Sequence, residues 1–296
     1  MHQWQPSGGN AEVKARDILS AAMWLHSTFA NRVWLWRGQA DHRFGVEPSV
    51  HTRVLNSTLS HSEDTSIRAT RSLINSARDV KLDHRDGYKL PDLALLANLQ
   101  HHGAATPLLD VSTDPLIALW MIAFADAKHP ARLDDVPGSL FGIARPPAER
   151  WIDPMDSREY ESIAKNFGDQ TWWYRAPDVT ERLRIQRGSF LISALSTSNK
   201  RGDTTLPVEL ALDRENFIAN RIKSRGKRGN GHLGDIEAFR IAVPAASKKH
   251  LRTLLEDRSG LSIEAIYPTP WHQPFIVQFS SAYGRGRRLE LDIASP

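Results

Sequence analysis

The chain has 296 residues, of which 41% are hydrophobic and 24% charged, with a formal net charge of +4. This composition is typical of a globular protein and excludes collagen, a coiled coil and a wholly disordered chain. The longest apolar run, residues 116–125, is shorter than the roughly 18–20 residues that cross a bilayer. Cysteine is absent, so disulfides and thiolate chemistry are excluded. We expect a cytoplasmic protein that does not associate with a membrane.

The first elements expected along the chain are two helices with a strand between them. Apolar residues at helical spacing predict a helix over 11–29, with Asn10 as its N-cap. A short β-rich run at 33–36 predicts a strand. Residues 40–59 are expected to be irregular, and a second amphipathic helix is expected over 65–80.

The middle of the chain is strongly apolar. Pro91 and Asp92 are favourable helix-start residues and predict a helix that continues to about residue 99. Residues 106–111 are short and apolar, as in a buried strand. A helix over 114–124 is hydrophobic nearly all round, so we expect it to lie at the centre of the fold.

Later segments alternate between helix and strand patterns. Strands are expected at 140–144, 172–175, 183–186, 189–194 and 238–243, a helix at 247–257, and an extended piece at 263–267. Because these elements show no regular β-α-β alternation, the sequence predicts an α+β fold. We expect a single large domain with a central mixed or antiparallel sheet and flanking helices.

Two clusters of basic residues lie among glycines. Five arginines and lysines fall within 221–228 without an acid, and three arginines fall within 285–288. Loops of this kind can neutralise the phosphates of a nucleic acid or of a dinucleotide. The alternative is a solvated loop without a partner.

Arg37 follows the strand predicted at 33–36 and is succeeded by Gly38 and Gln39. A guanidinium at a strand end can bind a phosphate or a carboxylate with two parallel hydrogen bonds. The glycine allows a backbone or a ligand to approach closely. The alternative is an arginine that pairs with a neighbouring acid.

Residues 101–102 are adjacent histidines that precede the buried strand predicted at 106–111, near the end of which Asp110 lies. Their spacing does not fit a metal site of the HExxH kind, so no metal is expected. We expect one histidine to hydrogen-bond with the region of Asp110, because a carboxylate beside a buried strand needs partners. Ser112 and Thr113 either donate to that carboxylate or cap the next helix.

The third polar segment carries Arg184, Gln186 and Gly188. If this segment is extended, the three residues share one face. Gln186 would then offer a donor and an acceptor without charge. An ordinary edge strand is the alternative interpretation.

Taken together, these segments resemble the FRG domain, a bacterial and phage-associated family named after a Phe-Arg-Gly signature. The motifs that carry the resemblance follow one another in the order of the family. They are Trp-Arg-Gly-Gln at 36–39, Glu-Pro-Ser at 47–49 with Arg53, Gln-His-His-Gly at 100–103, the block at 106–113, the apolar helix at 118–125, Arg-Ile-Gln at 184–186 with Gly188 and Phe190, and a closing element at 241–268.

The resemblance implies an FRG-like domain over 31–270, preceded by an N-terminal helix at 1–30 and followed by a C-terminal extension at 271–296. This sequence departs from the family at several positions. Among them, Pro107 stands where an arginine is usual. The departure removes a residue that could serve as a second anion-binding cation.

A weaker resemblance, in motif order, is to ADP-ribosyltransferases. It implies that Arg37, with Gly38 and Gln39, binds the phosphates of NAD, which is the substrate. It also implies that Ser112 and Thr113 support the nicotinamide-ribose site.

The same resemblance puts Gln186 where these enzymes have a catalytic glutamate. An amide can hydrogen-bond ribose hydroxyls, but it does not stabilise positive charge as a carboxylate does. Asp110 or Glu181 would then supply the negative charge. We expect Arg37, His101, Asp110 and Gln186 to line one cleft, where a nearby acid raises the pKa of His101.

Three functions are compatible with these residues. The first is a toxin or phage-defence effector that ADP-ribosylates a nucleic acid or a protein, with an antitoxin or immunity protein as a further partner. The second is a non-catalytic module that senses a nucleotide or binds nucleic acid. The third is a nuclease that uses His101 as base and Asp110 as the residue that orients it.

Overall fold

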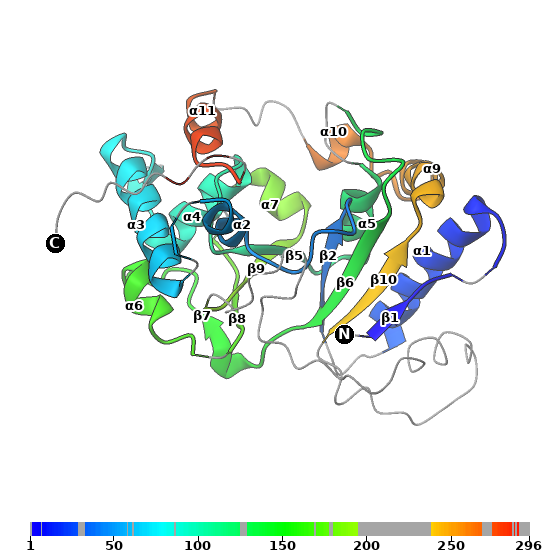
Figure 1. The fold of residues 1–296 in the computed structure, drawn as a ribbon, viewed down its shortest axis with the longest axis horizontal. Coiled ribbons are helices and arrows are strands. Elements are labelled where there is room, and N and C mark those ends of the chain that lie inside the picture. The colour runs from blue at the N-terminus through cyan, green and yellow to red at the C-terminus, as the bar shows by residue number, and fades with distance from the viewer. Residues whose placement is uncertain are drawn as a thin grey trace. The chain divides into compact units, whose positions relative to one another are not determined.

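The computed structural model describes most of the chain (Figure 1). The described residues are 2–6, 8–28, 33–57, 59–60, 62–85, 87–124, 129–168, 170–177, 180–194, 238–267, 274–285, 287 and 289. The fold is α+β with mixed sheets and flanking helices, which confirms the predicted class. The chain divides into two compact units. Unit 1 comprises Met1–Phe44, Val111–Arg145 and Val208–Pro268, and unit 2 comprises Gly45–Asp110, Pro146–Pro207 and Thr269–Pro296.

Unit 1 is built on a sheet whose strands are far apart in the sequence. The neighbouring strands are, in order, β1 (His2–Trp4), β10 (Ala238–Val243), β6 (Gly138–Ala144), β2 (Trp34–Gln39) and the end of β5 (Leu109–Ser112). Strand β1 runs parallel to β10, and the other neighbours are antiparallel. The sheet of unit 1 is therefore mixed.

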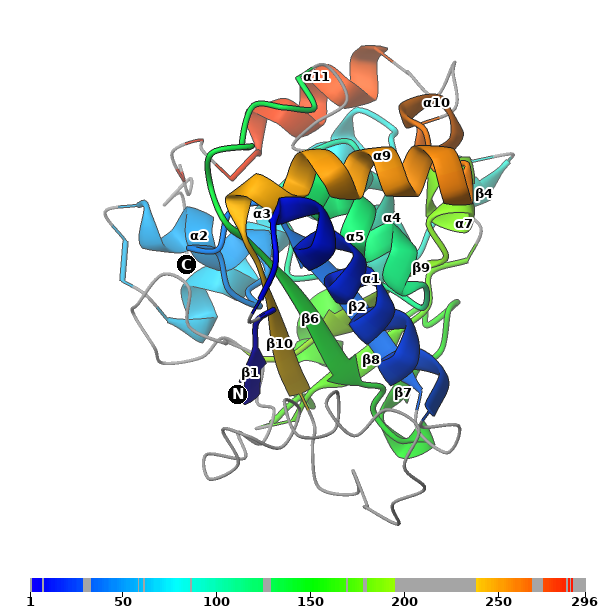
Figure 2. The same ribbon diagram turned by 90° about the vertical axis from the view of Figure 1, so that its right-hand side faces the viewer.

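Two helices of unit 1, α1 (Ala11–Thr28) and α5 (Pro115–Ala123), pack on this sheet, and α9 (Lys248–Ser259) packs on both of them. Figure 2 shows α1 in front of β2, with α9 across its upper end. Two shorter helices, η2 (Ala245–Ser247) and α10 (Ile263–Ile266), belong to the same unit. The predicted cap of α1 is confirmed, because the Val13 backbone N–H donates to Asn10 Oδ1 at 3.0 Å.

Large aromatic side chains fill the space between the sheet and these helices. The ring of Phe239 lies 4.8 Å from Trp34 and 5.5 Å from Trp36, measured between centroids. Gly142 is aligned with both Trp36 and Phe239, and a Cβ atom at Gly142 would meet the Phe239 ring at 2.2 Å. The glycine therefore makes room for the phenylalanine.

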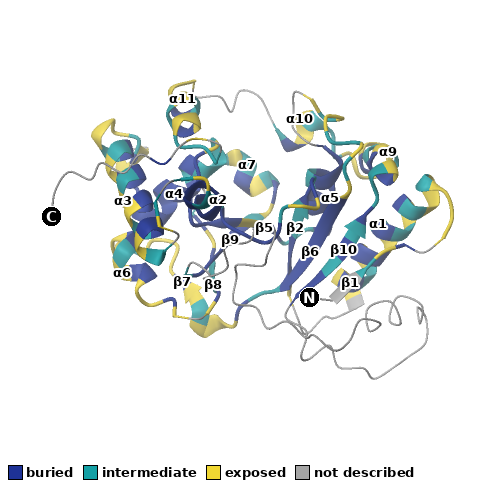
Figure 3. Ribbon diagram, in the orientation of Figure 1, coloured by how far each residue is buried: buried dark blue, intermediate teal, exposed yellow. Residues whose placement is uncertain are grey.

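Unit 2 is mainly helical. Its helices are α2 (Ser49–Leu55), α3 (Glu63–Asp79), α4 (Asp92–His101), η1 (Ala148–Arg150), α6 (Tyr160–Ala164), α7 (Glu181–Ile185) and α11 (Pro274–Ala282). Helix α4 is buried along most of its length, as the dark blue of Figure 3 shows. Among the helices of the described ranges, none combines the length and apolar character that crossing a bilayer requires.

The strands of unit 2 are short. The start of β5 is followed by β9 (Gly188–Ile192), β8 (Trp172–Tyr174) and β7 (Trp151–Ile152), and a separate hairpin joins β3 (His84–Arg85) to β4 (Tyr88–Lys89). Strands β8 and β9 are antiparallel, whereas β7 and β8 are parallel. The strand pairing in this unit is therefore also mixed.

Several predicted elements are wrong. The strand predicted at 183–186 is the helix α7, because Thr180 Oγ1 accepts a hydrogen bond from Leu183 N at 3.1 Å and caps a helical turn. The extended piece predicted at 263–267 is the helix α10, which Ser262 caps in the same way. The region predicted as irregular contains α2, and the strand predicted at 106–111 begins only at Leu109.

Candidate functional site

The side chains of β2 alternate between the two faces of the unit 1 sheet. Trp34, Trp36 and Gly38 point toward the helices, because Trp36 contacts His26 of α1 and Gly38 abuts Ala118 of α5. We call the opposite side the second face. It carries Arg37 and Gln39.

Register places two arginines in one row across the second face. Arg37 of β2 is the direct partner of Phe141 on β6, and Phe141 is the direct partner of Arg240 on β10. Directly opposed residues of antiparallel strands point to the same side of a sheet. Arg37 and Arg240 therefore stand on either side of Phe141, and both are partly exposed.

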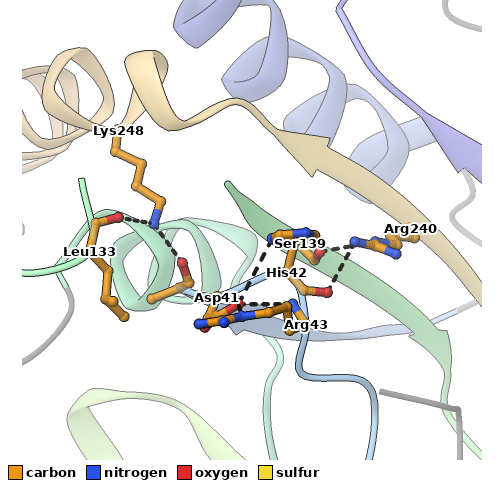
Figure 4. Close-up of polar contacts among 8 residues, drawn as sticks. Asp41, His42, Arg43, Leu133, Ser139, Arg240 and Lys248 are labelled. Carbon is orange, nitrogen blue, oxygen red and sulfur yellow. Dashed lines mark hydrogen bonds and ion pairs between the residues drawn. The ribbon is translucent and has the colours of Figure 1, made fainter. Parts of the chain in front are cut away.

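Neutral groups hold Arg240 in position (Figure 4). Its Nε donates to Ser139 Oγ at 2.9 Å, and its Nη2 donates to the His42 carbonyl at 3.3 Å. The guanidinium carbon lies 5.9 Å from the centroid of Phe141. Partial burial lowers the pKa of Arg240. Within the described part of the chain, no carboxylate forms an ion pair with this guanidinium.

An ion pair between Asp41 and Arg43 stabilises the turn that follows β2. Arg43 donates to both carboxylate oxygens of the buried Asp41, and this hydrogen-bonded pairing lowers the pKa of Asp41. The backbone N–H of His42 donates to the Pro137 carbonyl at 2.8 Å. The His42 carbonyl, which accepts a hydrogen bond from Arg240, is thus part of an ordered turn.

Lys248 secures the same turn from the helix side. Its side chain is buried, and its Nζ donates to the carbonyls of Ala40 at 2.5 Å and Leu133 at 2.7 Å (Figure 4). Burial lowers the pKa of Lys248 to about 8. A buried ammonium needs acceptors of this kind, so Lys248 joins α9 to the end of β2.

The close packing of α5 on β2 explains why position 38 is a glycine. A Cβ atom at this position would lie 1.9 Å from the Ala118 carbonyl oxygen and 3.0 Å from Ile122. The absent side chain lets α5 approach β2. Whether Gly38 and Gln39 also contact a ligand stays a prediction.

Ser112 and its neighbours begin α5. Ser112 Oγ accepts from Asp114 N at 3.0 Å, and Asp114 Oδ1 accepts from Leu116 N at 2.9 Å. Ser112 is the direct partner of Trp36, so it faces the helices rather than Arg37. Thr113 follows in the same turn. The structure gives Ser112 a helix-starting role, which was one of its two predicted alternatives.

Unit 2 contains a polar network centred on Gln100. Gln100 Nε2 donates to the Asp110 carboxylate, and Gln100 Oε1 accepts from the Thr106 hydroxyl. Thr106 Oγ1 also accepts from Leu108 N at 3.2 Å. Gln100 thus holds the exposed Asp110, a role that the sequence predicted for a histidine. The Gln-His-His-Gly motif was the signal that could have identified it.

His101 lies next to a cation rather than to an acid. The Arg182 side chain donates to the His101 carbonyl at 3.3 Å. Burial, together with the positive charge of Arg182, holds the pKa of His101 well below its usual range. The raised pKa predicted for His101 is therefore wrong. Its Nε2 is buried and has no hydrogen-bond partner in the described part of the chain.

Gln186 lies in a helix end rather than in a strand. It is buried and forms the C-cap of α7, and its backbone N–H donates to the Arg182 carbonyl at 2.9 Å. Because the two residues are four positions apart, their side chains lie on the same side of α7. The predicted face shared by Arg184, Gln186 and Gly188 does not form.

The predicted site residues divide between the units. Unit 1 holds Arg37, Gly38, Gln39, Ser112 and Thr113, and unit 2 holds His101, Asp110 and Gln186. One cleft lined by residues of both groups stays a prediction. The basic cluster at 221–228 lies outside the described residues, as does part of the cluster at 285–288.

Comparison with known proteins identifies part of this arrangement. Residues 32–131 match the family model of the FRG domain. The chain contains an FRG domain. The matched range includes β2, the Gln100 network and α5, whereas α7, Gln186 and Arg240 follow it. No curated protein and no solved structure matches the chain.

Proposed function

We propose that this FRG protein binds a nucleotide through Arg37 and uses NAD as the substrate of an ADP-ribosyl transfer. The observation that carries the proposal is the row on the second face, in which Arg37 and Arg240 flank Phe141. Both residues are partly exposed, and planar guanidinium groups bind phosphate oxygens with paired hydrogen bonds. The motif order of ADP-ribosyltransferases, in which a strand-end arginine binds the phosphates of NAD, adds support.

The proposed reaction breaks the bond between the ribose and the nicotinamide nitrogen of NAD. The electron pair of that bond stays with nicotinamide, which leaves neutral, while a nucleophile of the acceptor bonds to the ribose carbon and loses its proton. Positive charge develops on the ribose during this step, and a nearby carboxylate would stabilise it. Gln186 does not supply that charge. The resemblance to ADP-ribosyltransferases offers Asp110 or Glu181 for this role, and Asp110→Asn tests the first of them, whose carboxylate is exposed and held by Gln100.

The acceptor in this proposal is a nucleic acid or a protein, and the protein acts as a toxin or phage-defence effector. An antitoxin or immunity protein would then control it in the producing cell.

The uncharged Gln186 favours a second candidate function, a nucleotide sensor that binds NAD without cleaving it. The nuclease alternative has less support. A base needs to hydrogen-bond with the aspartate that orients it, and in the described ranges no hydrogen bond joins His101 to Asp110, which Gln100 holds instead.

Label transfer tests the proposal. The protein is incubated with NAD radiolabelled in its adenylate phosphate, together with DNA, RNA or a protein mixture, and the acceptors are separated. We expect label on one acceptor class, and a loss of at least about 100-fold with Asp110→Asn, as for the removal of a transition-state charge. Asp79→Asn changes an exposed acid of the same unit and is the matched control. NAD that binds without any transfer of label would favour the sensor instead.

A further inference from the structure

Arg240 is a charged side chain that has no acidic partner among the described residues. It is partly buried on the second face, and burial lowers its pKa. Arginine is rarely buried without a partner of opposite charge. Ser139 and the His42 carbonyl accept hydrogen bonds from Arg240 without neutralising its charge.

The hydrogen bonds of Arg240 orient the group and leave donors available. A guanidinium has five N–H donors, and Arg240 uses two of them, on Nε and Nη2. The other three have no acceptor in the part of the chain that the structure describes. The ring of Phe141 fixes the group further through its cation–π contact at 5.9 Å. The guanidinium is therefore held in place with a net charge and with three donors that no described residue accepts from.

The position of Arg240 relative to Arg37 suggests what it binds. Neighbouring strands are about 4.8 Å apart, so the Cα atoms of these two arginines, with β6 between them, are about 10 Å apart. Two long side chains at this separation can contact one ligand that carries two adjacent phosphoryl groups. A single phosphoryl group offers fewer oxygen acceptors to two guanidinium groups than a diphosphate does.

We infer that Arg240 is a second phosphate-binding residue beside Arg37, and that the site takes a diphosphate, as in a nucleoside diphosphate or a dinucleotide. The inference rests on the proposed function for the role of Arg37. It adds a binding residue outside the matched FRG range and names the diphosphate as the part of the ligand that this residue binds. It also supplies a second cation in a chain that has Pro107 where the family commonly has arginine.

Calorimetric titration with inorganic pyrophosphate and with orthophosphate tests this inference. We expect Arg240→Gln to weaken pyrophosphate binding by about 10- to 100-fold and orthophosphate binding much less, because one charge-assisted contact is lost. Arg258→Gln removes an exposed charge of the same unit and is expected to leave both affinities unchanged. No binding of pyrophosphate, or equal binding by wild type and Arg240→Gln, would overturn the inference.

A second measurement uses only the wild-type protein, in case Arg240→Gln does not fold. Phenylglyoxal modifies accessible arginines, and the modified sites are identified by peptide mass spectrometry. We expect pyrophosphate to protect Arg37 and Arg240 together, whereas sodium chloride of the same ionic strength does not. Modification of Arg240 that is unaffected by pyrophosphate would contradict the inference.

The inference and the proposed function can fail separately. Pyrophosphate binding that depends on Arg240, without transfer of label from NAD, would support the diphosphate site and reject the transferase. Transfer from NAD that is unchanged by Arg240→Gln would support the transferase and reject this role of Arg240.

Discussion

Gln100 donates a hydrogen bond from Nε2 to the carboxylate of Asp110, ten positions further along the chain. The same amide accepts a hydrogen bond from the Thr106 hydroxyl at its Oε1. One side chain at the end of α4 therefore spans the connection to β5. Only an amide offers a donor and an acceptor in this arrangement, because a carboxylate at position 100 would repel Asp110. The network explains why a glutamine stands before the histidine pair.

Replacing Thr106 by valine is expected to destabilise the protein by about 1–3 kcal/mol, because Gln100 Oε1 and Leu108 N lose a partner in a buried position. Urea unfolding measures the free-energy change. Thr253→Val is the matched control, since the Thr253 hydroxyl is exposed on α9 and bonds only to the Lys249 carbonyl. We expect that control to stay within about 0.5 kcal/mol of wild type. Equal stability of the two variants would mean that the network contributes little.

Replacing Gly38 by alanine is expected to cost about 1–3 kcal/mol of unfolding free energy, because the new methyl group overlaps the Ala118 carbonyl. Thermal and urea unfolding are the measurements. Gly8→Ala adds the same group where no atom lies within 4 Å, and serves as the control. A Gly38→Ala protein as stable as Gly8→Ala would show that α5 does not pack on β2 as closely as described.

The lowered pKa of Lys248 predicts that the free energy of unfolding rises with pH. Its pKa is about 8 in the folded chain and 10.5 for an ordinary lysine, so the unfolded state binds more protons between these values. The unfolding free energy of the wild type should therefore increase as the pH rises above about 8. Lys248→Met should remove this increase. Measurements stop near pH 9.5, because burial raises the pKa of Tyr160 and Tyr174, which opposes the trend from about pH 10. A rise of equal size in both proteins would contradict the assignment.

The lowered pKa of His101 predicts that the protein loses stability in mild acid. Its pKa is lowered in the folded chain, so below about pH 6.5 the unfolded state takes up a proton that the folded state does not. The wild type should lose unfolding free energy as the pH falls from 7 to 5.5, and His101→Gln should lose less. His250→Gln, on α9, is the control. If His101→Gln follows the wild-type curve, the histidine is not buried beside a cation.

Much of unit 1 could be predicted from the sequence, because its elements have clear patterns. Asn10, Asp114 and the apolar periodicity of α1 and α5 indicate where these helices begin and which faces they bury. Segment 183–190 was harder to predict. The spacing of Leu183 and Phe190 fits both a helical and a strand pattern of apolar residues. The Thr180 cap distinguishes the two, but in the sequence one threonine is weak evidence for a helix.

The candidate site was predicted only in part, since its geometry depends on strand register. Arg37 is evident in the sequence as part of β2, but nothing local indicates that Arg240, on a strand that begins at position 238, shares its row. The role of Gln100 depends on the turn that brings Asp110 back to it. The pKa of His101 depends on Arg182, which is distant in sequence.

The most direct test of the account is the affinity of the protein for NAD with and without the Arg37 guanidinium. Calorimetric titration of NAD into wild type, Arg37→Gln and Arg258→Gln measures it, with unfolding midpoints confirming that each variant is folded. We predict that Arg37→Gln binds NAD at least about 10-fold more weakly than wild type, because a bidentate phosphate contact is lost. Arg258→Gln should bind NAD like the wild type. A folded Arg37→Gln protein that binds NAD as tightly as wild type would contradict the central claim.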